Sequence, residues 1–201
     1  MNRIGDGTYP DVHGVLIYRA GKLVVEEYFY EYDRDRAHQM RSASKSIVSA
    51  LVGIAIDRAA LSGDSELVTK RFPYESYANP DPRKERLTLR DLLTMRSGLA
   101  CDDCDGSSLG NEARVYQSAD WVKYVLDLPM AEPPGTRGRY CSGNVLVAGR
   151  IVEHATGKPL LAFAQAHLFT PLGIRAVINT ATSGGASGST RRCRAARAAS
   201  T

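Results

Sequence analysis

Apolar and β-branched residues gather in two short runs near the start of the chain. Residues 13–19 and 22–30 are rich in β-branched and aromatic side chains, and the pair Ala20-Gly21 lies between them. Two such runs joined by a short link that contains glycine are typical of a β-hairpin. We therefore expect one pair of antiparallel strands in this region.

The segment that follows has a helical pattern. Apolar residues recur at helical spacing and also fill the flanking positions, and a helix that is apolar nearly all round is buried on most sides. The pattern predicts a buried helix that begins near Ser42 and ends near residues 61–63. The apolar positions are Ile47, Val48, Leu51, Val52, Ile54, Ala55 and Ile56.

Proline residues interrupt the next part of the chain, so we expect residues 64–86 to form loops. Thr88 and Asp91 have the spacing of a capping box, which predicts a short helix that ends before Gly98. We expect Ser118 to cap a further helix that runs through Leu126.

Two more helices are expected near the end of the apolar sequence. The first runs from Val145 to Ala155 and stops at Gly157. The second is amphipathic, runs from Leu160 to Leu168 and ends at Pro171-Leu172-Gly173.

Length and charge narrow the class of protein. The chain has 201 residues, enough for one ordinary domain or a piece of a larger one. Its net charge is +4, but residues 182–201 hold four arginines and no acid, so the rest is neutral. A neutral body gives no basis for nucleic-acid binding. Apolar runs fall short of a membrane span, and the N-terminus lacks the pattern of a signal peptide.

Ser42 and Lys45 stand three residues apart at the start of the first predicted helix. Residues with this spacing share a helix face, and the N-terminus of a helix favours developing negative charge. A lysine can serve as the base that activates a serine. About one Ser-x-x-Lys is expected by chance in a chain this long. The alternative is therefore an ordinary helix start with Ser42 as its cap and Lys45 in solvent.

The surrounding sequence favours the catalytic interpretation. Ser42-Ala43-Ser44-Lys45 follows the predicted hairpin and opens an apolar helix, and Tyr140-Cys141-Ser142 opens another. This order resembles the serine β-lactamase and penicillin-binding-protein family, especially its class C-like esterases, D-aminopeptidases and 6-aminohexanoate-dimer hydrolases. Its first motif is Ser-x-x-Lys, and its second is Tyr-x-Asn or a relative. Residues 87–99 also resemble the family's sequence between these motifs.

The resemblance runs from about His13 to Ile174. It implies an α/β (α+β) fold of the β-lactamase/transpeptidase type, with an N-terminal strand hairpin, a mostly helical portion, and the late sheet strands missing. We interpret residues 1–174 as the N-terminal portion of such a hydrolase domain. Residues 181–201 lack apolar periodicity, and we expect residues 175–201 to be a disordered or out-of-frame tail. Translating the coding DNA in the other two frames past codon 174 tests the second idea.

The resemblance also implies a role for each candidate residue. Ser42 would attack an acyl carbonyl, Lys45 would take its proton, and Tyr140 would relay protons to and from the leaving group. Water would then release the acyl group, and no cofactor or metal is implied. Ser142 and Asn144 are candidate substrate-binding residues. Ser142 stands where the family has Asn, and this departure favours esters.

The family's third motif, Lys-Thr-Gly or His-x-Gly, does not follow Tyr140. The nearest candidate, residues 154–157, lies at a predicted helix end. That motif's strand supplies one of the two oxyanion donors, and losing one donor typically costs about a hundredfold in rate. We therefore expect a weakly active or inactive serine hydrolase that would act on a small acyl substrate, an ester, amide or β-lactam. The alternative is a non-catalytic scaffold or receptor domain that binds acyl or peptide-like ligands.

The four cysteines are Cys101, Cys104, Cys141 and Cys193. Cys101 and Cys104 form a lone C-x-x-C pair, which lacks the second pair of a zinc site. Whether Cys101 and Cys141 face each other near the site and form a disulfide stays open; it would require an oxidising compartment. The acidic loop 102–111 lacks EF-hand spacing, so we favour a solvated loop over a calcium site. The compartment and the oligomeric state also stay open.

Overall fold

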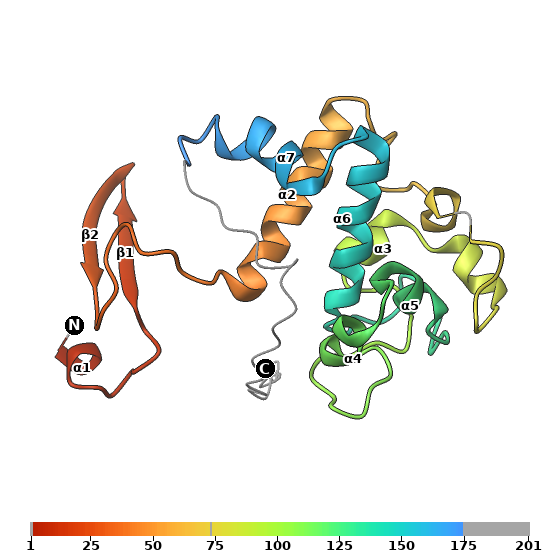
Figure 1. The fold of residues 1–201 in the computed structure, drawn as a ribbon, viewed down its shortest axis with the longest axis horizontal. Helices are drawn as coiled ribbons and strands as arrows, with labels where there is room; N and C mark the ends of the chain where they lie inside the picture. Colours follow the sequence, from red (N-terminus) through yellow and green to blue (C-terminus); the bar gives the residue numbers. More distant parts are fainter. Residues whose placement is uncertain (1, 73, 175–201) are drawn as a thin grey trace, which may run out of the picture. The chain divides into compact units, whose positions relative to one another are not determined.

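The computed structural model describes residues 2–72 and 74–174. The described residues fall into two compact units, one up to residue 41 and one from residue 42 onward (Figure 1). The predicted tail from residue 175 onward lies outside the described residues. In the described ranges, no helix is both long and apolar enough to cross a membrane.

The first unit is a hairpin preceded by a short helix, α1 (Asn2–Gly5). Strand β1 (Gly14–Arg19) pairs antiparallel with β2 (Lys22–Tyr28), with one register shift between Ile17 and Tyr18. Ala20 and Gly21 both have positive φ angles, 49° and 74°, which suit the tight turn that the sequence predicts. The hairpin prediction is confirmed, and β2 ends two residues before the expected limit.

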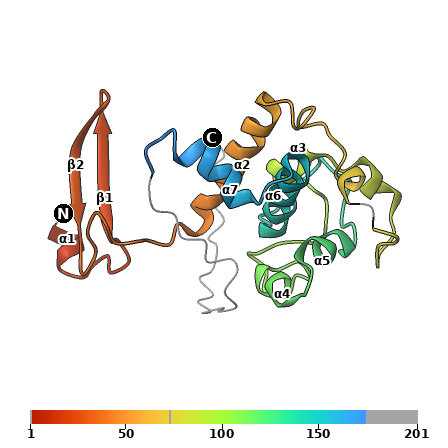
Figure 2. The same cartoon turned by 45° about the horizontal axis from the view of Figure 1, so that its top comes forward.

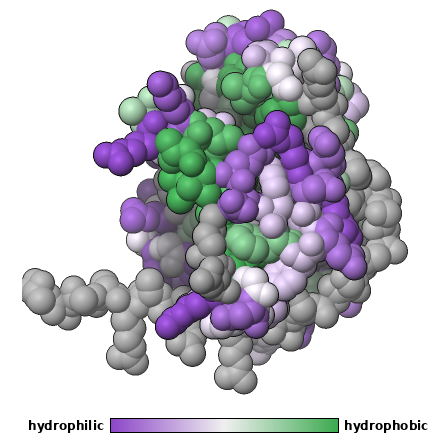
Figure 3. All heavy atoms as spheres, turned by 90° about the vertical axis from the view of Figure 1, so that its left-hand side faces the viewer, coloured by the Kyte–Doolittle hydropathy of each residue, from purple (hydrophilic) through white to green (hydrophobic). Residues whose placement is uncertain are grey.

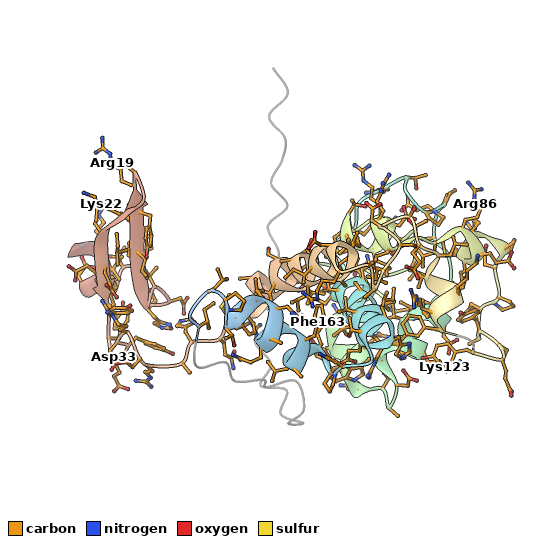
Figure 4. The ribbon with its side chains drawn as sticks, turned by 90° about the horizontal axis from the view of Figure 1, so that it is seen from above. Arg19, Lys22, Asp33, Arg86, Lys123 and Phe163 are labelled. Atoms are coloured by element: carbon orange, nitrogen blue, oxygen red, sulfur yellow. A yellow bond between two sulfur atoms is a disulfide. The ribbon has the colours of Figure 1, made fainter. Side chains whose placement is uncertain are left out.

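Charged and apolar side chains are both exposed on this hairpin. Arg19 and Lys22 flank the turn at its tip (Figure 4). Figure 3, which faces this unit, shows apolar residues gathered at the surface beside charged ones. A two-stranded sheet has too little area to bury large apolar side chains on both faces. The exposed ones on the two strands are Leu16, Ile17, Tyr18, Leu23 and Val24.

The second unit is helical and is built around α6 (Ser142–Thr156). This helix packs against α2 (Ser44–Asp57), α3 (Leu89–Leu93), α4 (Glu112–Gln117), α5 (Trp121–Asp127) and α7 (Leu160–Ala164). Figures 1 and 2 both show α2 and α6 side by side. Gly143 permits the close packing of α5, because a Cβ there would lie 2.7 Å from a methyl of Val125.

Helix α2 departs from its prediction in two ways. It ends at Asp57, four residues before the expected region, and of its residues only Leu51, Val52 and Ala55 are buried. The expectation of burial on most sides is therefore wrong for the described structure. An apolar helix is buried only where another element covers it, and here α6 covers one face. The most buried helix is α6 instead.

Helix boundaries elsewhere are partly confirmed. The capping box of α3 is present, since Thr88 and Asp91 each accept a hydrogen bond from the other's backbone. Helix α6 ends at Gly157, as predicted, with φ of 66°. The cap of α5 is Asp120 rather than Ser118, which instead follows α4. Both residue types cap helices well, so the sequence alone does not separate them.

Two regions have more structure than the sequence suggested. The expected loop 64–86 contains two short 3₁₀ helices, Val68–Arg71 and Pro82–Arg86. The predicted helix 160–168 is α-helical only to Ala164, and a π-helical turn, Gln165–Phe169, continues it.

Candidate active site

Ser42 lies in a single 3₁₀ turn, Arg41–Ala43, that leads directly into α2. The residue before it, Arg41, has φ of 48°, in the left-handed region that side-chain-bearing residues seldom adopt. A residue held in this conformation costs the fold about 1–3 kcal/mol. The sharp turn leaves Ser42 exposed at the start of the helix.

Lys45 occupies the first turn of α2, and its ammonium nitrogen donates a hydrogen bond to Ser42 Oγ at 3.2 Å. The first turn contains no acidic residue, and Ala43 provides no side-chain cap. A cation at this end of a helix is unfavourable for the helix dipole. The start of α2 therefore lacks a side-chain cap and carries an unfavourable cation. Such departures from stabilising patterns are common at functional sites.

The aromatic ring of Tyr140 lies at the same place. The Lys45 nitrogen lies over its ring, 5.0 Å from the ring centroid, within the range of a cation–π contact. Tyr140 is 36% exposed and comes just before α6. The structure therefore brings together Ser42, Lys45 and Tyr140, the three residues predicted to be catalytic.

A disulfide joins Cys101 to Cys141, the residue after Tyr140. The hypothesis that these cysteines pair is thus confirmed. Both are buried, whereas Cys104, the other cysteine of the C-x-x-C pair, is exposed. The bond fixes the position directly beside Tyr140 to a segment that lies far from it in sequence.

Asp103, in the loop after α3, contacts the residues near Tyr140, although the sequence did not predict it as a site residue. Its carboxylate accepts hydrogen bonds from the backbone N–H of Ser142 at 2.7 Å and of Glu112 at 2.8 Å. Burial raises the pKa of the Asp103 carboxyl above its ordinary value, and the bonds from Ser142 and Glu112 oppose that rise. The acidic loop 102–111 was expected to be solvated, and for this side chain the expectation is wrong.

Ser142 and Asn144, the predicted substrate-binding residues, are both buried at the start of α6. The Asn144 amide nitrogen lies 3.8 Å from the sulfur of Met95. Among the described atoms, Ser142 Oγ and Asn144 Oδ1 lack a hydrogen-bond partner. Their role in binding substrate stays a prediction, and in this structure neither side chain is open to solvent.

Histidines and other side chains of metal-binding type also occur among the described residues. No group of three or more His, Cys, Asp or Glu side chains there is arranged to hold a metal ion. His154 lies near the end of α6, where its ring nitrogen contacts the carbonyl oxygen of Arg71. It therefore occupies a helix end, as the sequence predicted.

Comparison with known sequences gives a match over most of the chain. The family model described as Beta-lactamase matches residues 9–196. Esterase EstB of Burkholderia gladioli is 30% identical over 173 residues, which cover 81% of this chain and 44% of EstB.

Solved structures give the same result for the fold. A Bacteroides dorei DSM 17855 protein provisionally described as a β-lactamase aligns with a TM-score of 0.68 and 24% identity. The match covers 89% of this chain and 52% of that one. EstCE1, described as a hydrolase with promiscuous acyltransferase activity, aligns with a TM-score of 0.63 and 20% identity over 81% of this chain and 46% of its own. The chain thus spans about half the length of the proteins that it matches.

Proposed function

The chain belongs to the β-lactamase family of serine hydrolases and has the β-lactamase/transpeptidase-like fold, and on this premise we propose that it carries a serine acyl-hydrolase site. In this proposal Ser42 is the nucleophile, Lys45 its base and Tyr140 the group that passes a proton to the leaving group. The observation that carries it is the hydrogen bond between Lys45 and Ser42 beside the Tyr140 ring.

The first step forms the acyl-enzyme. Ser42 Oγ attacks the carbonyl carbon of the substrate, and its proton passes to the Lys45 nitrogen, which must give up its own extra proton before it can serve as the base. Their separation of 3.2 Å is at the upper end of the range for a direct transfer, and such distances often shorten when substrate binds. The carbonyl oxygen gains negative charge, which the backbone N–H of Ser42 at the start of α2 can stabilise.

The second half of the reaction moves the proton on and releases the acyl group. Tyr140 gives its phenolic proton to the departing oxygen and regains one from Lys45, whose nitrogen lies over its ring. Water then attacks the acyl-enzyme, the same groups take its proton, and Ser42 is restored. The net reaction is hydrolysis, with no cofactor in any step.

We propose a carboxylic ester as the substrate class. Ser142 stands where the family has Asn, and it is buried, so an amide-gripping side chain is missing from this position. Two similar proteins support this choice: EstB is named an esterase, and EstCE1 is described as a hydrolase with acyltransferase activity.

The test is intact mass after exposure to a fluorophosphonate probe. We expect one adduct per chain, which Ser42→Ala abolishes and Ser46→Ala, on the exposed side of the same helix, retains. Because Ser42 is exposed, its replacement should change the free energy of unfolding by less than about 0.5 kcal/mol. A folded chain without an adduct overturns the proposal and favours a non-catalytic scaffold.

A further inference from the structure

Residues 139–142, which include Tyr140, are each bonded to the segment from Met95 to Asp103. Arg139 N–H donates to the Met95 carbonyl oxygen at 2.9 Å, and Asp103 N–H donates to the Tyr140 carbonyl oxygen at 2.8 Å. The next two residues are held by the Cys101–Cys141 disulfide and by the hydrogen bond from Ser142 N–H to Asp103 Oδ2. Tyr140 therefore lies in the middle of a continuous brace.

Asp103 holds this brace on the C-terminal side of the tyrosine, and the bond from Arg139 N–H to the Met95 carbonyl holds the N-terminal side. The backbone N–H of Asp103 binds the carbonyl of Tyr140, and its carboxylate binds the N–H two residues further on. A peptide segment held at both ends has little freedom to rotate about its own backbone bonds. The direction of the Tyr140 side chain is therefore linked to the position of Asp103.

The same carboxylate also connects two helix starts. Ser142 and Glu112 are the first residues of α6 and α4, and the N–H groups at these positions have no partner within their own helices. A carboxylate at a helix N-terminus is favoured by the helix dipole. A purely structural role as a double cap would need only these two bonds. A further bond, from the backbone N–H of Asp103 to the Tyr140 carbonyl, places this cap directly beside the candidate active site.

We propose that Asp103 is a positioning residue that holds Tyr140 against Lys45 for proton transfer to the leaving group. The proposal rests on the role of Tyr140 in the proposed function. It does not require Asp103 to touch the substrate. Its effect should therefore appear in the step that needs the tyrosine proton and not in the attack by Ser42.

The variants are Asp103→Asn, which keeps one oxygen acceptor, and Asp103→Ala, which keeps none. Asp105→Asn is the matched control, because Asp105 lies in the same loop and its carboxylate accepts only local bonds from Ser107. Circular dichroism and the urea midpoint identify variants that fold. If Asp103→Ala fails to fold, Asp103→Asn carries the test.

The first readout is a comparison of two leaving groups. A p-nitrophenyl ester releases an anion that needs no proton, whereas an ethyl ester releases an alkoxide that does. We expect Asp103→Ala to lower kcat/KM for the ethyl ester at least about tenfold more than for the p-nitrophenyl ester, since a 1 Å displacement can cost about a hundredfold. For Asp103→Asn, the difference between the two losses should be smaller than for Asp103→Ala. For Asp105→Asn, the ratio of kcat/KM for the two esters should match that of the wild type. Equal losses for both esters would reduce Asp103 to a structural role.

The second readout does not depend on activity. With 3-fluorotyrosine in the chain, the ¹⁹F signal of Tyr140 is the one that disappears in Tyr140→Phe. We expect it to shift or broaden in folded Asp103→Ala and to stay in place in Asp105→Asn. An unchanged Tyr140 signal overturns the proposal whether or not the chain hydrolyses esters. A displaced signal in a chain that never reacts with fluorophosphonate supports the positioning by Asp103 and refutes the proposed function alone.

Discussion

The ammonium nitrogen of Lys45 lies 5.0 Å from the centre of the Tyr140 ring and, at the same time, 3.2 Å from Ser42 Oγ. The Lys45 nitrogen thus contacts both the candidate nucleophile and the aromatic ring of the candidate proton donor. Lys45 lies on α2, and Tyr140 comes just before α6. The packing of these two helices therefore sets the distance between Lys45 and Tyr140. The site is therefore as rigid as the helix pair that carries it.

Replacing Tyr140 by Phe isolates the phenolic hydroxyl. The ring and its contact with Lys45 remain, so we expect a change in unfolding free energy below about 0.5 kcal/mol. Loss of an acid–base group should lower kcat for an ethyl ester by about 10²–10⁴-fold. Fluorophosphonate labelling of Ser42 should fall less. Steady-state kinetics measures kcat for both variants, and Tyr18→Phe, at an exposed strand residue, is the control. Wild-type rates in Tyr140→Phe would remove the tyrosine from the mechanism.

Gly98 permits a close approach between its own segment and residues 130–133. It has φ of 76°, and a Cβ there would lie 2.2 Å from the Glu132 carbonyl oxygen. Its own carbonyl accepts hydrogen bonds from the N–H groups of Ala131 and Glu132. Gly98→Ala must move this backbone, and we expect it to destabilise the helical unit by more than about 1 kcal/mol.

The matched control for that substitution is Gly106→Ala. Gly106 lies in an exposed loop, and a Cβ there would meet no atom within 4 Å. We expect its urea midpoint to match that of the wild type. Equal midpoints for Gly98→Ala and Gly106→Ala would show that the 98–132 contact contributes nothing to stability.

The elements that the sequence predicted well are those whose determinants are close together in the chain. The turn of the hairpin needs only Ala20 and Gly21, and the capping box of α3 needs only Thr88 and Asp91. The approach of Ser42 to Lys45 follows from helical spacing in the same way. The role of Tyr140 is predicted only by the family resemblance, since no local sequence pattern links this residue to α2.

The parts that the sequence did not predict depend on distant partners. Asp103 binds Ser142 and Glu112, and nothing in the acidic loop itself distinguishes this carboxylate from its solvated neighbours. Asp103 lies beside Tyr140 because the Cys101–Cys141 disulfide joins the two segments, and the sequence left that pairing open. The burial of α2 was overestimated because its hydrophobicity does not say which neighbour covers each face.

The Cys101–Cys141 disulfide should stabilise the helical unit. It links residues separated by 40 positions, and closing a loop of this size typically contributes about 2–4 kcal/mol. We expect the double variant Cys101→Ala/Cys141→Ala to lose a free energy of this order in urea unfolding. Cys104→Ser, at an exposed cysteine, should retain the wild-type midpoint. If a reductant leaves the wild-type midpoint unchanged, the bond does not contribute.

The ion pair between Asp81 and Arg83 predicts how stability depends on acid pH. Hydrogen bonds from the Arg83 side chain and backbone lower the pKa of the Asp81 carboxyl from 3.8 to about 2. Because the folded state holds the proton more weakly than the unfolded state, this pair stabilises the fold above about pH 4. Its contribution should disappear as the pH falls from about 4 to about 2.

The measurement is the urea midpoint of the wild type and of Asp81→Asn between pH 2 and pH 7. Asn still caps the following 3₁₀ helix, so the variant removes the charge and keeps a side-chain acceptor for the Arg83 N–H. We expect the difference in urea midpoint between the wild type and Asp81→Asn to be constant from pH 5 to 7 and to shrink toward zero at pH 2. Arg83→Gln should show the same closing difference, because it removes the cation that lowers the Asp81 pKa. A difference that stays constant down to pH 2 would mean that Asp81 titrates alike in the folded and unfolded chains.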